Sequence, residues 1–177
     1  MTEAGAAAPG ALALPLVLIG PMGAGKTRVG QKLAAETGAP FVDTDARIVE
    51  RYGPIDEIFA REGEEYFRIV EREVVAEAIA EQAVVSLGGG AVLHPATRAE
   101  LAALPVVWLQ VSAAAVAPRL AGGARPLIAQ GGLDAWIRIR DERAPVYASL
   151  ADLAIDTSRR SVARIVADIT ERFGGAA

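Results

Sequence analysis

The sequence predicts a three-layer α/β fold, in which a five-stranded parallel sheet carries helices on both faces. Short apolar runs alternate with longer segments whose apolar residues recur every three or four positions, the spacing of an amphipathic helix. Strands that alternate with helices are joined by right-handed crossovers, which produce a parallel sheet covered on both sides. The predicted strands are Leu14–Ile19, Pro40–Val42, Val84–Leu87, Val106–Val111 and Leu153–Ile155.

The predicted helices lie between these strands and after the last one. They are Arg28–Thr37, Ala46–Tyr52, Tyr66–Ile79, Ala96–Leu104, Ala113–Leu120, Leu133–Tyr147 and Ser161–Phe173. A chain of 177 residues is long enough for one domain with a sizeable core. We expect a flexible N-terminal tail over residues 1–13, a single domain over residues 14–173 and a C-terminal tail over residues 174–177.

Composition excludes several classes of function. The net charge of −4 provides no broad basic field for nucleic acid or an anionic membrane. The chain has no Cys, which excludes disulfides, thiolate nucleophiles and zinc–thiolate sites. The segment 4–25 is uncharged, but three prolines interrupt it and no basic region precedes it, so neither a membrane span nor a signal peptide is predicted. We expect a cytoplasmic protein without nucleic-acid or membrane partners.

The segment Gly20–Thr27 reads G-x-x-x-x-G-K-T, the pattern of a phosphate-binding P-loop. It follows a predicted strand and precedes a predicted helix, which is the context this motif requires. Glycines let backbone N–H groups turn toward phosphate oxygens, and the helix N-terminus adds partial positive charge. The chain has 16 Arg but only 2 Lys, and one of these is Lys26, so lysine is used here where a point charge on a flexible side chain is needed. A glycine-rich turn that matches by chance is the alternative, and the strand–loop–helix context favours the P-loop.

Two carboxylates, Asp43 and Asp45, follow the second predicted strand. If the chain stays extended there, both point to the same side, at the sheet edge where ligands of parallel α/β folds bind. One could then serve a metal ion while the other orients or deprotonates an attacking hydroxyl. The alternative is that Asp45 only caps or begins the helix Ala46–Tyr52.

Three further features are weak when taken singly. Gly88–Gly90 ends the third strand and would let backbone amides approach a ligand, although it could be a flexible turn. Arg68 lies in a predicted helix, where it could simply pair with Glu64, Glu65 or Glu71 on the solvated face. Arg143 lies in a predicted helix as well and is weak evidence by itself. Glycines frame the segment from about 119 to 133, which predicts a mobile lid or, alternatively, an ordinary surface loop.

Together these motifs resemble those of the shikimate kinase family, over roughly residues 15–173. The motifs, in order, are the P-loop Gly20–Thr27, Asp43–Asp45, Gly63–Arg68, Gly88–Gly90, Arg125–Leu127 and Arg143–Tyr147. The resemblance implies a P-loop kinase fold and transfer of the γ-phosphoryl group of ATP to the 3-hydroxyl of shikimate, in the route to chorismate and the aromatic amino acids. It also implies Mg²⁺ with ATP as co-substrate, and we expect a monomer. A gluconate kinase, a nucleoside monophosphate kinase and a metabolite-sensing module without turnover stay as alternatives.

The resemblance also assigns roles to individual residues. The implied catalytic residues are Lys26, Asp45 and Arg125. The implied ATP-binding residues are Gly23, Ala24, Gly25, Lys26, Thr27, Arg119, Arg125 and Arg160, and Arg159 could replace Arg160. The implied shikimate-binding residues are Asp45, Arg68, Gly89, Gly90 and Arg143. The implied Mg²⁺ ligands are Thr27 and Asp43, the latter through water.

Overall fold

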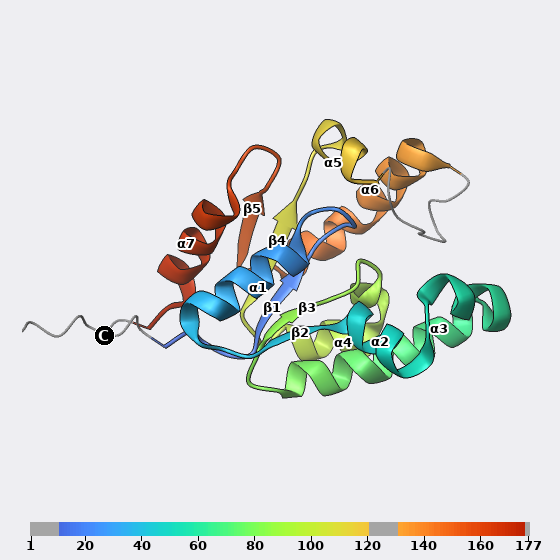
Figure 1. The fold of residues 1–177 in the computed structure, drawn as a ribbon, viewed down its shortest axis with the longest axis horizontal. Helices are drawn as coiled ribbons and strands as arrows, with labels where there is room; N and C mark the ends of the chain where they lie inside the picture. The colour runs from blue at the N-terminus through green and yellow to red at the C-terminus, as the bar shows by residue number, and fades with distance from the viewer. Residues whose placement is uncertain (1–10, 121–130, 176–177) are drawn as a thin grey trace, which may run out of the picture.

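The computed structural model describes residues 11–120 and 131–175, which form three layers around a five-stranded sheet (Figure 1). All strand pairs are parallel, in the order β2-β3-β1-β4-β5. The strands are β1 (Leu16–Ile19), β2 (Phe41–Asp43), β3 (Val84–Ser86), β4 (Val106–Gln110) and β5 (Leu153–Asp156). The predicted five-stranded parallel sheet is therefore confirmed, with strand boundaries that move by one or two residues.

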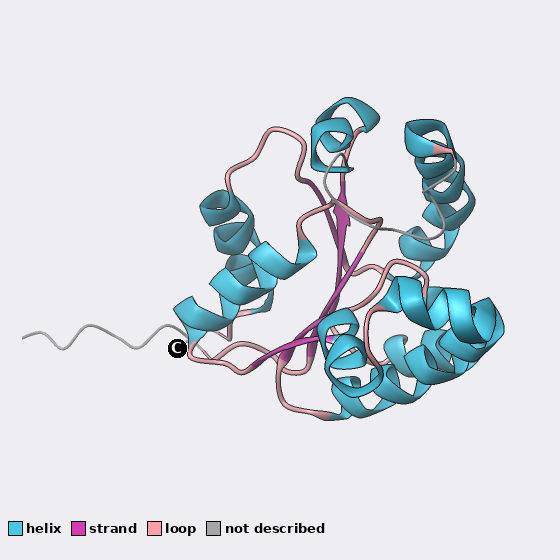
Figure 2. Cartoon of the chain, turned by 45° about the vertical axis from the view of Figure 1, so that its right-hand side comes forward, coloured by secondary structure: helices cyan, strands magenta, loops and turns pink. Residues whose placement is uncertain are grey.

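Helices cover both faces of this sheet, as Figure 2 shows from a second direction. They are α1 (Lys26–Thr37), α2 (Thr44–Tyr52), α3 (Ile55–Ala80), α4 (Pro95–Leu101), α5 (Ala113–Leu120), α6 (Gly132–Leu150) and α7 (Val162–Phe173), with a 3-10 turn η1 (Ala91–Leu93) before α4. Each predicted helix has a counterpart among them. The three-layer arrangement follows from this alternation of strands and helices.

The central strand β1 is buried on both faces and divides the core in two. Leu16 and Leu18 belong to a cluster with residues of α1 and α7, whereas Val17 and Ile19 belong to a cluster with residues of α3, α4 and α6. Successive side chains of a strand point to opposite faces, so one apolar run supplies both halves of the core. This explains why the strand appears in the sequence as a continuous apolar run rather than an alternating one.

Helix α3 differs from the prediction because it begins at Ile55 rather than near Tyr66. Gly63 interrupts it with a left-handed backbone, φ 85° and ψ 174°, so α3 is two helical segments joined at a kink. Glycine adopts this conformation without the steric cost that a Cβ atom imposes. The first segment brings Phe59 against Phe67 of the second, with ring centroids 4.7 Å apart. The unpredicted segment forms one wall of the cavity described below.

The two ends of the described chain meet beside the sheet. Leu12 forms an antiparallel bridge with Gly174, and the Ala13 N–H donates to the Phe173 carbonyl at 3.1 Å. Leu12 is only 9% exposed. Residues 11–13 and 174–175, which the sequence analysis assigned to the tails, therefore contact each other in the structure. Residues 1–10, 176 and 177 lie outside the described part of the chain.

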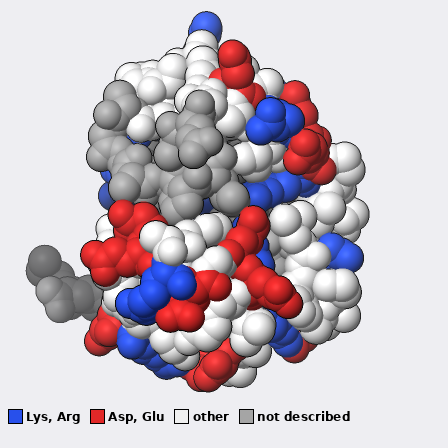
Figure 3. Space-filling view, turned by 90° about the vertical axis from the view of Figure 1, so that its right-hand side faces the viewer, with Lys and Arg blue, Asp and Glu red and all other residues white. Residues whose placement is uncertain are grey.

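Acidic and basic side chains are interspersed over the face that carries α3 and α6 (Figure 3). Many form ion pairs with one another, including Arg72 with Glu100 and Arg140 with Asp141. Such exposed pairs contribute little stability individually. In the two stretches that the structure describes, no helix combines the length and apolar character that spanning a membrane requires.

Gly30 lies in α1 at a close approach to the sheet. A Cβ atom at this position would overlap the Phe41 ring and would lie 3.2 Å from Leu18 Cδ1. The lack of a side chain here lets α1 pack directly against β1 and β2, and this contact fixes the direction in which the helix leaves the P-loop.

Gly30→Ala should therefore destabilise the protein by about 1–3 kcal/mol, because the added methyl group overpacks the core. Helix propensity alone predicts the opposite, a gain of about 1 kcal/mol. The free energy of unfolding in urea decides between the two, with Ala35→Gly on the exposed face of the same helix as the control. A Gly30→Ala protein more stable than the wild type would contradict this packing argument.

Candidate active site

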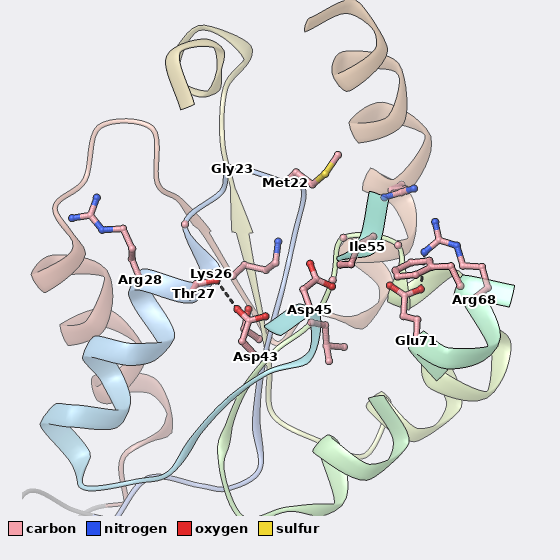
Figure 4. A pocket seen from close by; sticks show the side chains of 18 of the residues that line it. Met22, Gly23, Lys26, Thr27, Arg28, Asp43, Asp45, Ile55, Arg68 and Glu71 are labelled. Carbon is pink, nitrogen blue, oxygen red and sulfur yellow. Dashed lines mark hydrogen bonds and ion pairs between the residues drawn. The ribbon is translucent and has the colours of Figure 1, made fainter. Parts of the chain in front are cut away.

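A cavity of about 360 Å³ lies at the carboxyl ends of β1, β2 and β3. Its described walls come from the P-loop, the start of α2, both segments of α3, the triple glycine and α6. This is the edge at which ligands bind in open parallel sheets. Figure 4 shows Lys26, Asp43 and Asp45 between Arg28 on one side and Arg68 with Glu71 on the other.

The P-loop connects β1 to the first turn of α1 through three glycines with positive φ. Gly20, Gly23 and Gly25 have φ values of 141°, 79° and 93°, and α1 begins directly afterwards at Lys26. Side chains are strained at such angles, which explains the glycine pattern. The Lys26 ammonium donates to the Gly20 carbonyl at 2.8 Å and to the Pro21 carbonyl at 3.0 Å. The helix N-terminus and this cation together produce a positive site suited to phosphate.

Thr27 and Asp43 meet at the start of α1. The Thr27 hydroxyl donates to Asp43 Oδ2 at 2.6 Å, while Asp43 Oδ1 accepts from the Ala46 N–H at 3.2 Å. Asp43 is therefore the N-cap of α2, which begins at Thr44. The premise that the chain stays extended through Asp45 was wrong, because this cap starts the helix earlier. Both carboxylates nevertheless line the cavity.

Asp45 lies in the first turn of α2 and faces the triple glycine. A Cβ atom at Gly88 would lie 2.6 Å from Asp45 Oδ1 and 2.9 Å from Glu71 Oε1, so a side chain there would displace both carboxylates. Thr44, fully buried, accepts from the Gly88 N–H at 3.1 Å and donates to the Ser86 carbonyl at 3.2 Å. These bonds join the start of α2 to the end of β3 and thereby fix Asp45 beside the cavity.

Arg68 enters the cavity from α3 between two glutamates. It donates to Glu71 Oε2 at 2.6 Å and to Glu64 Oε1 at 3.1 Å. Burial opposes the charge on Arg68, but its contacts with Glu71 and Glu64 outweigh this effect and raise its pKa. Burial also raises the pKa of Glu71, against the opposing effects of Arg68 and Arg143. The ion pair therefore only partly offsets the cost of burying the Glu71 carboxylate.

Arg143 reaches the same place from α6 and is only 8% exposed. A Cβ atom added at Gly89 would lie 3.5 Å from Arg143 Nη1. A Cβ atom added at Gly90 would overlap the Arg68 guanidinium. The two predicted substrate arginines thus converge on the backbone of the triple glycine. A planar anion between them could accept charge-assisted hydrogen bonds from both.

The remaining predicted ATP residues lie outside the described cavity lining. Arg119 donates to the Gly23 carbonyl at 2.8 Å, so it contacts the P-loop itself. Arg160 pairs with Asp168 of α7 at 2.6 Å, and Arg159 is exposed beside it. Arg125, together with most of the predicted lid, falls in residues 121–130, outside the described residues.

Several residues in or beside the cavity escaped the sequence analysis. Phe59 was missed because no helix was predicted between Tyr52 and Gly63, although Ile55, Ile58 and Phe59 have helical spacing. Glu71 was considered only as a surface partner for Arg68, and its burial depends on tertiary packing. Tyr147 stood inside a recognised motif without a role, yet its hydroxyl donates to the Gly89 carbonyl at 2.6 Å.

A P-loop, paired carboxylates and two convergent arginines in one cavity define a P-loop kinase for a small anionic metabolite. The family model described as shikimate kinase matches residues 22–173. The shikimate kinase of Thermobifida fusca (strain YX) is 49% identical over 82% of this chain and 86% of its own length, and that of Mycobacterium avium (strain 104) is 44% identical over 89% and 92%. The chain belongs to the shikimate kinase family.

A solved structure extends this likeness to three dimensions. The shikimate kinase from Acinetobacter baumannii in complex with shikimate is 32% identical, with a TM-score of 0.84 over 89% of this chain and 90% of that chain. The family resemblance inferred from the motifs and the P-loop kinase fold are therefore both confirmed.

The buried Glu71 carboxyl should make stability depend on pH. Since its pKa is raised in the folded state, folding favours the protonated form, and its contribution to stability is lost as pH rises above the ordinary value of 4.5. Glu71→Gln removes this titrating carboxyl and its pH dependence. The free energy of unfolding of the variant minus that of the wild type should therefore increase from pH 4 to pH 7. Urea unfolding across this range measures the difference.

Glu64→Gln is the matched control, because Glu64 contacts the same arginine from a largely exposed position. The free energy of unfolding of Glu64→Gln minus that of the wild type should rise much less with pH. A difference for Glu71→Gln that stays constant or falls as pH increases would contradict the burial argument.

Proposed function

We propose that the protein transfers the γ-phosphoryl group of ATP to the 3-hydroxyl of shikimate, for the route to chorismate and the aromatic amino acids. The observation that carries this proposal is the single cavity shared by the P-loop, Asp45 and the two arginines that converge on the triple glycine. Membership of the shikimate kinase family supports the same substrate.

The shikimate carboxylate would bind between Arg68 and Arg143. Arginine presents its donors in a planar fork that matches a carboxylate, and charge-assisted bonds of this kind are stronger than neutral ones. The Gly89 and Gly90 N–H groups would complete the site, because no side chain separates them from the ligand. This arrangement would leave the ring hydroxyls of shikimate directed toward Asp45 and the P-loop.

Asp45 would hold the 3-hydroxyl and accept its proton as the hydroxyl oxygen attacks the γ-phosphorus. The bond between the γ-phosphorus and the β–γ bridging oxygen breaks, so ADP leaves with that oxygen. Lys26 would neutralise charge on the β- and γ-phosphate oxygens. Arg125 is proposed as the third catalytic residue on the family resemblance alone.

ATP would bind along the P-loop through the Gly23, Ala24 and Gly25 backbone, with Lys26 and Thr27 at the phosphates. Arg119 and Arg160 are proposed to flank the adenine, and the Arg119 contact with the loop carbonyl supports a place near the nucleotide. We also propose a cytoplasmic monomer without nucleic-acid or membrane partners. The charge of −4 supports the lack of such partners, and the absence of Cys is compatible with a reducing cytoplasm.

Mg²⁺ would be held by Thr27 directly and by Asp43 through water. Their oxygen atoms lie 2.6 Å apart at the phosphate side of the P-loop, and Mg²⁺ prefers such hard oxygen ligands together with substrate phosphates. The Ala46 N–H holds one Asp43 oxygen and so orients the other. When bound, the metal would supply positive charge that neutralises the phosphate oxygens.

A coupled assay of ADP release tests this function directly. Turnover with Mg²⁺ and ATP should be fast with shikimate and negligible with gluconate or AMP, and Lys26→Ala should abolish it. Preference for gluconate or AMP would overturn the substrate assignment. ATP binding without turnover on any of the three would favour a sensing module instead.

Asp45→Asn and Arg143→Ala should separate catalysis from binding. Asp45→Asn should lower kcat by about 10²- to 10⁴-fold and keep shikimate affinity within tenfold, because an amide cannot accept the proton. Arg143→Ala should weaken shikimate binding by about 30- to 1000-fold, from the loss of about 2–4 kcal/mol of charge-assisted bonding.

Calorimetric titration with shikimate and with ADP separates these effects, since ADP affinity should hardly change in either variant. An Asp45→Asn enzyme with unchanged kcat and a raised KM would make Asp45 a binding group. Equal losses of shikimate and ADP affinity in Arg143→Ala would make that arginine structural.

A further inference from the structure

Helix α6 holds both glycine loops of the active site through two buried aromatic donors. The Trp136 indole N–H donates to the Met22 carbonyl of the P-loop at 2.9 Å, and the Tyr147 hydroxyl donates to the Gly89 carbonyl at 2.6 Å. The two aromatic residues are 1% and 0% exposed. They lie about three turns apart on α6, whose course past the sheet can be followed in Figure 1.

Each of these bonds fixes the direction of a backbone N–H group. In a trans peptide the C=O of one residue and the N–H of the next share a plane and point in opposite directions. Among the described residues the one cis peptide bond is Leu14–Pro15, so both loop peptides are trans. Because the Met22 carbonyl points toward α6, the Gly23 N–H points away from it. In the same way, the Gly89 carbonyl points toward α6 and the Gly90 N–H points away from it.

Each of these two N–H groups lies where a different substrate of the proposed reaction would bind. Gly23 lies in the P-loop with φ 79°, and an added Cβ would overlap Val116, so its backbone lies close against α5. The Gly89–Gly90 peptide lies beside Arg143 on one side and Arg68 on the other. In the part of the chain that the structure describes, neither the Gly23 nor the Gly90 N–H donates to a protein group.

We propose that Trp136 and Tyr147 are positioning residues, which orient the Gly23 N–H toward the ATP phosphates and the Gly90 N–H toward the shikimate carboxylate. The inference rests on the proposed function, since it assigns each N–H to one of its two substrates. Preorganised backbone donors bind a charged ligand better than donors that must first be ordered, because ordering costs free energy at the moment of binding.

The neighbouring P-loop carbonyls are held in the same manner. Arg119 donates to the Gly23 carbonyl and Thr157 to the Ala24 carbonyl, at 2.8 and 2.9 Å. Three consecutive loop carbonyls thus accept side-chain bonds from three separate segments, and Trp136 supplies the first. For the other loop, burial raises the pKa of Tyr147 to about 12, so its hydroxyl stays a proton donor over the whole physiological range.

A purely structural role is the competing explanation, because buried donors generally need acceptors. Trp108 shows that an indole can be buried in this fold without one, since its N–H has no partner in the described structure. The two explanations differ in which ligand each residue affects. If the role is structural, replacing the residue lowers stability and weakens the binding of both ligands alike. If the residue positions an N–H group, replacing it weakens the binding of one ligand only.

The test uses Trp136→Phe and Tyr147→Phe in the full chain, titrated by calorimetry with ADP and Mg²⁺ and, separately, with shikimate. Trp136→Phe should weaken ADP binding by about three- to tenfold and leave shikimate affinity within twofold, as expected for one lost hydrogen bond. Tyr147→Phe should do the reverse. Trp108→Phe is the control for Trp136→Phe, because it shortens an indole without breaking a hydrogen bond, and it should leave ADP affinity unchanged.

If Trp136→Phe does not fold, a benzothienylalanine at position 136 replaces the N–H by sulfur at nearly constant shape and tests the same bond. Wild-type affinity for both ligands, or equal losses of both, would overturn the proposal for that residue. A wild-type protein that binds neither ADP nor shikimate would instead refute the proposed function, so the two failures are distinguishable.

Discussion

Strand β3 lies between β1 and β2, and the whole active site depends on this pairing. Ser86 at its end is in register with both Leu18 and Asp43, although these residues are far apart in the sequence. Parallel strands that end at the same edge bring together the loops that follow them. The P-loop, the two carboxylates and the triple glycine therefore meet around one cavity, and neither α3 nor α6 would have a site to complete without this register.

The cavity is organised by charges that the protein buries at a cost. Glu71 is 3% exposed and pairs with Arg68, while Arg143 at 8% adds positive charge nearby. A buried ion pair seldom stabilises a fold by itself, since desolvation offsets most of the attraction. Here it holds the Arg68 guanidinium beside Gly90, while Arg143 lies beside Gly89. Under the proposed function, less ordering would then be needed when the ligand binds.

The accuracy of the sequence analysis varied with the range of the interactions involved. Strands and helices were predicted well, because apolar periodicity is a local signal. The segment Ile55–Glu62 was missed although it has helical spacing, and the start of α2 was wrong because Asp43, not Asp45, caps it. Trp136 and Tyr147 are aromatic residues of the kind that indicate core, and their polar contacts involve partners far away in sequence. Glu71 pairs with Arg68 only three residues away, but its burial depends on tertiary packing.

The sequence alone determined the fold class, the family and the P-loop, since the glycine conformations and the helix N-terminus that bind phosphate arise within eight consecutive residues. It also supplied the residue types that grip a carboxylate. Only the tertiary structure decided which arginines converge and that α6 reaches both glycine loops. Those contacts join segments separated by many residues, so they depend on strand order and helix packing rather than on any local pattern.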